Sequence, residues 1–129
     1  MAEKEIIQTD RAPGPFQGAP YNQAIRVGDF VFVAGQVGAR LDTGELAGPS
    51  VEEQTEQVMR NLAAILEAAG SGLDKLVKTT VFLLDLTDFG GMNEVYASHV
   101  GDRPPARSTI GIAQLPAGAR VEIEAVAHV

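Results

Sequence analysis

The segment from Pro49 to Gly70 constrains the fold more than any other part of the sequence. Ser50 lies three residues before Glu53, the spacing of a capping box that starts a helix. Beyond this start, apolar residues recur at helical spacing, and Gly70 supplies the stop. These apolar positions are Val51, Val58, Leu62, Ile65, Leu66 and Ala69. A helix with one apolar face must cover another layer, which we expect to be a sheet.

Runs of apolar and β-branched residues on both sides of this helix predict the strands of that sheet. Residues 24–27 and 30–34 are separated by Gly28-Asp29, which suits a tight hairpin turn. The other predicted strands are a short stretch at 6–9 and longer ones at 76–86, 107–113 and 121–129. Residues 10–20 hold three prolines and two glycines and are expected to form a loop.

A second helix is predicted between the strands at 76–86 and 107–113, because Phe89, Met92, Tyr96 and Val100 keep a helical period. The order ββ-α-β followed by α-ββ predicts an α+β or mixed α/β fold around one core. The chain has 129 residues, the usual size of one domain, so we expect a single domain over residues 1–129.

Composition excludes several classes of function. The formal net charge is −7 and no cluster of Lys and Arg is visible, which disfavours nucleic acid and anionic lipid as partners. Without Cys, the chain has no disulfide, thiol nucleophile or thiolate metal site. No segment has the apolar run of a signal peptide or a bilayer span, and a cytoplasmic location is the simplest expectation.

Strand alternation brings out Arg107 and Glu122 as candidate functional residues. In the strand from 107, Ile110 and Ile112 share one face, while Arg107 and Thr109 share the other. If the apolar faces lie under the helices, Arg107 and Glu122 both project from the far side of the sheet. Composition alone favours a structural salt bridge of Arg107 with Glu122, or with the adjacent Glu124, over a role in a site.

Asn93 and the two histidines are further polar residues that we consider as candidates for a functional site. Asn93 lies near the apolar stripe of the second predicted helix, where it could contact a ligand or bond to nearby backbone. His99 and His128 fall on different elements, and no set of His, Asp and Glu shows the spacing of a metal site. We therefore expect no metal.

Five ordered runs resemble the RidA (YjgF) family of reactive-intermediate deaminases over essentially the whole chain. They are Pro20-Tyr21-Asn22-Gln23-Ala24, Val33-Ala34-Gly35-Gln36, Val77-Lys78-Thr79-Thr80-Val81-Phe82, Pro105-Ala106-Arg107-Ser108 through Leu115-Pro116, and Val121-Glu122-Ile123-Glu124-Ala125. The resemblance implies a chorismate-mutase-like α+β fold, with a mixed sheet and two helices packed on one of its faces. It also implies a homotrimer with a barrel-like core of sheets and ligand clefts at the subunit interfaces.

The resemblance further implies hydrolysis of 2-enamine and 2-imine acids, such as 2-aminoacrylate and 2-iminopropanoate, to 2-keto acid and ammonia without a cofactor. By match, Arg107 binds the substrate carboxylate and Glu122 holds the attacking water. Tyr21 and Asn93 match further cleft residues, and Gly35 and Thr109 match positions whose backbone borders the ligand.

The sequence departs from the family pattern at three places. Ala34 stands where many members have Ser, Thr109 stands where many have Cys, and the loop from Gly14 to Ala19 is not the commonest form. These departures keep open a non-catalytic module that binds small carboxylates or other proteins. Ribonuclease activity has also been attached to the family, but the acidic net charge disfavours direct RNA binding.

Overall fold

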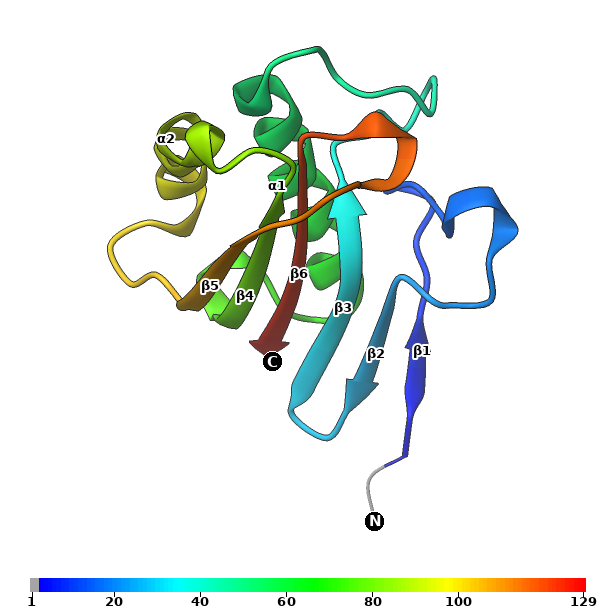
Figure 1. Cartoon of the computed structure of the whole chain (residues 1–129). Helices are drawn as coiled ribbons and strands as arrows, with labels where there is room; N and C mark the ends of the chain where they lie inside the picture. The colour runs from blue at the N-terminus through cyan, green and yellow to red at the C-terminus, as the bar shows by residue number, and fades with distance from the viewer. Residues whose placement is uncertain (1–2) are drawn as a thin grey trace.

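The computed structural model describes residues 3–129 and shows one six-stranded sheet with two α-helices (Figure 1). The strands are β1 (Glu5–Ile7), β2 (Ala24–Val27), β3 (Phe30–Val37), β4 (Leu76–Leu83), β5 (Ala106–Gly111) and β6 (Val121–His128). The helices are α1 (Val51–Ala68) and α2 (Phe89–Val100). The strand order is β1-β2-β3-β6-β4-β5, and β4 and β5 are the parallel pair in an otherwise antiparallel sheet. The predicted mixed-sheet α+β class is confirmed.

The predicted capping box starts α1. The backbone N–H of Glu53 donates to Ser50 Oγ at 3.1 Å, and the backbone N–H of Ser50 donates to Glu53 Oε1 at 3.3 Å. These bonds satisfy donors that the first turn of a helix leaves without partners. The predicted hairpin is also present, with β2 and β3 antiparallel across Gly28, whose φ is +59°.

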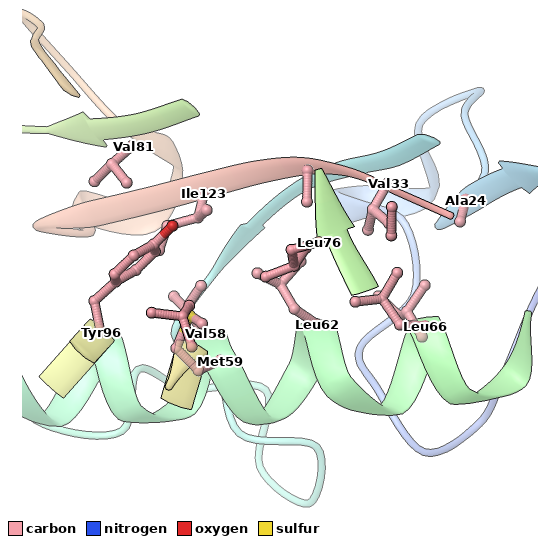
Figure 2. Close-up of a cluster of buried hydrophobic side chains, with 14 of the residues drawn as sticks. Ala24, Val33, Val58, Met59, Leu62, Leu66, Leu76, Val81, Tyr96 and Ile123 are labelled. Carbon is pink, nitrogen blue, oxygen red and sulfur yellow. The ribbon is translucent and has the colours of Figure 1, made fainter. Parts of the chain in front are cut away.

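The hydrophobic core lies between the two helices and one face of the sheet (Figure 2). Side chains of Val33, Val81 and Ile123 point from the strands toward α1, which contributes Val58 and Leu62. In β6 the buried residues alternate with less buried ones, as a strand covered on one face requires.

Within residues 3–129, the other face of the sheet carries no α-helix and exposes several large apolar side chains. Phe30, Phe32 and Ile110 are 47%, 49% and 45% exposed. We call this the open face. Glu122 belongs to it, since Phe82 pairs with both Ile110 and Glu122 across the neighbouring strands. The prediction that Glu122 lies on the side away from the helices is therefore confirmed.

The prediction for β5 is wrong. Arg107 pairs with Thr79, and Thr79 pairs with Ala125, so Arg107 lies on the helix-covered face, opposite to Glu122. The alternation within β5 holds, but Ile110 faces away from the core. The physical reason is that β5 is an edge strand, beyond the area that α1 covers, so its apolar side chains need not mark the buried face.

Candidate functional site

Arg107 lies against two aromatic rings of α2. Its guanidinium carbon is 4.9 Å from the centroid of the Tyr96 ring and 5.4 Å from that of Phe89. Both distances fall in the range of cation–π contacts. Arg107 extends from the edge strand β5 toward the first and second turns of α2, and its side chain is partly exposed.

No acidic side chain of residues 3–129 pairs with Arg107. The ion pairs in this part of the chain are Arg11–Glu67, Arg60–Glu56, His99–Glu56 and Arg120–Asp88. The structural salt bridge of Arg107 with Glu122 or Glu124 is therefore not formed within the chain. A cation held on neutral rings keeps its in-plane N–H donors available to an anion.

Asn93 shares a helix face with these rings, four residues after Phe89 and three before Tyr96. Its Oδ1 atom is buried and has no hydrogen-bond partner in residues 3–129. Buried amide oxygens normally accept a hydrogen bond, so this acceptor can take a donor from outside the chain. Thr109 follows Arg107 by two residues and extends from the same face of β5, beside Val81. Arg107, Asn93 and Thr109 form the first group of predicted site residues.

Glu122, Tyr21 and Gly35 form the second group, around a cavity of about 250 Å³. Phe16 and Pro116 complete its apolar wall. Burial, with a smaller effect from the charge of Glu124, raises the pKa of the Glu122 carboxyl above its ordinary value. A carboxyl of this kind exchanges protons closer to neutral pH, as acid–base chemistry requires.

Gly35 lies directly under the Glu122 carboxylate. A methyl group at Gly35 would overlap with Oε2 of Glu122 and come within 2.9 Å of its Cδ atom. Gly35 lies between Val33 and Gln36, where the register between β3 and β6 shifts. The missing side chain at Gly35 is thus what lets the carboxylate occupy its place.

The loop before β2 is held by Tyr21. Its hydroxyl oxygen accepts a 2.6 Å hydrogen bond from the backbone N–H of Phe16, within a 3₁₀ turn over Phe16–Gly18. Residues 10–20 form the loop that the prolines predicted. Tyr21 therefore fixes the wall of the cavity through its hydroxyl, in addition to lining it with its ring.

The structure brings the six predicted residues together as two groups of three, not as one site. Three residues that support Arg107 or its ring contacts were not singled out from sequence: Phe89, Tyr96 and Thr79. Phe89 and Tyr96 were recognised only as members of the apolar stripe. The phenol in that stripe was the available signal, because a buried tyrosine hydroxyl needs a partner.

Residues 3–129 contain no group of three or more His, Asp and Glu placed to hold a metal ion. Within the same residues, no helix has the length and apolar content needed to cross a membrane.

The mixed sheet with both helices on one face, and Arg107 without an acidic partner in residues 3–129, define a class of α+β proteins. The family model described as endoribonuclease L-PSP matches residues 10–129. The chain belongs to this family, which is the RidA (YjgF) family that the sequence resembles.

Similar proteins agree with this assignment. A RutC family protein of Pyrococcus abyssi is 47% identical over 97% of both chains. The mouse protein named 2-iminobutanoate/2-iminopropanoate deaminase is 42% identical, covering 96% of this chain and 90% of its own. The crystal structure of Escherichia coli TdcF with bound serine has a TM-score of 0.88 and 39% identity, over 97% of this chain and 98% of that one.

Proposed function

We propose that the protein hydrolyses small 2-imino and 2-enamino acids to the 2-keto acid and ammonia. The observation that carries the proposal is the guanidinium of Arg107, which lies on two aromatic rings and pairs with no acidic side chain of residues 3–129. The deaminase named in mouse supports the reaction class.

Arg107 binds the substrate carboxylate in this proposal. The planar fork of a guanidinium matches the two carboxylate oxygens, and such charge-assisted pairs are stronger and more directional than neutral hydrogen bonds. Contact with neutral rings uses none of the N–H donors of the guanidinium, which leaves them for the substrate. Asn93, whose Oδ1 lacks a partner in residues 3–129, is suited to accept a hydrogen bond from the imine or enamine N–H.

Glu122 serves the reacting carbon. Water adds to the C=N carbon while one of its protons passes to the Glu122 carboxylate, and the nitrogen takes up a proton. Collapse of the resulting carbinolamine breaks the C–N bond, releases ammonia and leaves the C=O bond of the keto acid. The raised pKa of Glu122 suits a group that both accepts and returns a proton. No oxidation state changes, so the proposed reaction needs no redox cofactor.

The complete site requires two copies of the chain. Arg107 and Glu122 lie on opposite faces of one sheet, whereas a 2-imino acid carries its carboxylate on the imine carbon itself. A homotrimer, in which one copy offers Arg107, Asn93 and Thr109 and the next offers Glu122, Tyr21 and Gly35, would unite the groups. The exposed apolar side chains of the open face favour its burial between copies.

Two of the three departures from the family pattern are the single residues Thr109, which belongs to the first group, and Ala34, which precedes Gly35. Thr109 lies on the Arg107 side of β5, and the backbone N–H of Ala34 donates to the carbonyl of Gln23 at 2.9 Å. Neither side chain offers a proton-transfer group of suitable pKa. In this proposal, proton transfer therefore rests on Glu122, and the backbone at Gly35 and Thr109 borders the ligand.

The test is to generate 2-iminopropanoate in situ and follow release of keto acid at catalytic protein concentration. Arg107→Ala should lower kcat/KM by about 100-fold or more, since it removes a charge-assisted pair. Glu122→Gln should lower kcat by a similar factor. Arg103→Ala and Glu94→Gln are matched controls, because both residues are exposed and lie in neither group. Absence of acceleration by the unmodified protein would exclude this activity for that substrate.

A second function, binding of small carboxylates without turnover, is favoured by one observation. The related TdcF structure holds serine, an amino acid that carries a carboxylate. Persistent binding of a small carboxylic acid that depends on Arg107, without release of keto acid from the imine, would favour this function over the deaminase.

A further inference from the structure

We infer that Tyr96, anchored by Thr79, and Phe89 position the Arg107 guanidinium for carboxylate binding, and that these three residues thereby set substrate affinity. The inference rests on the proposed function, because it assigns Arg107 a ligand. It adds positioning residues that touch no reacting atom.

The Tyr96 ring is the fixed part of this arrangement. Its side chain is 4% exposed, and its hydroxyl shares a buried 2.7 Å hydrogen bond with Oγ1 of Thr79, in which either group can donate. Figure 2 shows the ring rising from α2 toward the sheet, close to Val81 and Ile123. A ring packed on its sides and bonded at its tip has little freedom to move.

The anchor and the arginine lie on neighbouring strands. Thr79 of β4 pairs with Arg107 of β5, and both side chains face α2. Thr79, Tyr96 and Arg107 are therefore connected to one another. Thr79 and Arg107 are paired across the sheet, and the Tyr96 side chain contacts both of them. The buried Tyr96 ring therefore ties the position of the Arg107 guanidinium to the protein core, although Arg107 itself belongs to an edge strand.

Aromatic rings suit this task better than a carboxylate would. A carboxylate would occupy the N–H donors of Arg107 and compete with the substrate for them. The ring faces attract the cation without using those donors. Burial raises the pKa of the Tyr96 phenol, so the ring stays neutral at neutral pH and does not cancel the charge of Arg107.

Phe89 contributes the second ring from the exposed first turn of α2. Its side chain is 42% exposed, and its centroid lies slightly farther from the guanidinium carbon than that of Tyr96. Because Phe89 is not in the core cluster, it can be replaced with little effect on folding. That property makes Phe89 a test of the inference that does not depend on the stability of the core.

The experiment measures KM and kcat for 2-iminopropanoate, and calorimetric binding of the keto-acid product pyruvate, in Tyr96→Leu, Tyr96→Phe, Thr79→Val and Phe89→Leu. Loss of the Tyr96 ring should raise KM and the Kd for pyruvate about tenfold, and loss of the Phe89 ring should raise both about threefold. We expect kcat to change less than about twofold, since the contact serves substrate and transition state alike. Tyr96→Phe and Thr79→Val, which keep the ring and release its tip, should raise KM by about twofold.

Val100→Ala is the control for destabilisation of α2. Val100 is buried one turn beyond Tyr96 and offers Arg107 no aromatic ring, so its truncation should lower Tm and leave KM unchanged. The inference is overturned if Phe89→Leu and Thr79→Val retain both the KM and the pyruvate Kd of the unmodified protein. It is equally overturned if Val100→Ala raises KM as much as the ring variants do. Failure of the deaminase itself would appear separately, as pyruvate binding without any turnover of imine.

Discussion

Arg107 and Glu122 extend from opposite faces of one sheet, on strands β5 and β6, and β4 lies between these strands. A small substrate that contacts both residues must therefore meet them on two different copies of the chain. A site formed between two copies of the chain can therefore be distinguished by experiment from a site within one copy.

Mixing two inactive variants should restore activity. When Arg107→Ala and Glu122→Gln chains are co-expressed in equal amounts, about a quarter of the interfaces should combine an intact Arg107 with an intact Glu122. Activity should therefore recover to about a quarter of that of the unmodified protein, whereas each variant alone stays inactive. Oligomers that contain both chains by native mass spectrometry and yet show no recovery would contradict the shared site.

Gly35→Ala should impair the reaction more than the fold. The added methyl group would overlap with the Glu122 carboxylate and displace it, and a displacement of about 1 Å can lower kcat about 100-fold. Gly90→Ala is the matched control, because a methyl group there meets nothing within 4 Å. Equal kcat values for the two alanine variants would show that the reaction does not depend on the position of the Glu122 carboxylate.

Glu122→Gln should raise stability at neutral pH. The folded-state pKa of Glu122 is raised above 4.5, chiefly by burial, so its ionised form is disfavoured in the folded chain. The contribution of Glu122 to stability is full below pH 4.5 and is lost as pH rises through its folded pKa. Thermal unfolding should give a higher Tm for the variant at pH 7 and no such gain at pH 4. A variant that is less stable at pH 7 would contradict this reading.

Glu56→Gln should weaken the connection between the two helices. Glu56 of α1 contacts His99 of α2 at 2.8 Å and Arg60 at 2.8 Å, and these hydrogen bonds, that with His99 first, lower the pKa of the Glu56 carboxyl. Its contribution is full above pH 4.5 and is lost as pH falls through the lowered pKa.

Urea unfolding at about pH 6 should therefore show a loss of about 0.5–1 kcal/mol for Glu56→Gln, and the difference should shrink toward about pH 3. Glu67→Gln serves as control, since the Glu67 carboxylate pairs, among the described residues, with Arg11 alone, at 3.4 Å, and both side chains are 57% exposed. An equal loss in both variants would contradict a special contribution from the contact between helices.

The local elements were predictable because their signals are local. The capping box of Ser50 and the turn at Gly28 depend on residues within a few positions, and both are present as predicted. Strand β4 ends earlier than predicted, because residues 86–88 form a 3₁₀ turn in which Thr87 N–H donates to the Asp85 carboxylate. The competing hydrogen bond of an Asp side chain ends the strand.

The face of Arg107 was not predictable from alternation alone. Which side of β5 meets a helix depends on the register with β4 and on the edge position of the strand, and both are set by long-range pairing. The bond between Tyr96 and Thr79 likewise joins residues 17 positions apart on different elements. The sequence indicated Arg107 and Glu122 as candidate residues, but only the sheet pairing shows that their side chains extend from opposite faces.

Strand β6 lies between β3 and β4, although it comes last of the six strands along the chain. During synthesis, the hairpin of β2 and β3 and the parallel pair of β4 and β5 therefore cannot join until residues 121–128 have been made. Until this strand is added, the sheet consists of two incomplete halves with open edges. The strand that carries Glu122 is thus also the strand that completes the sheet.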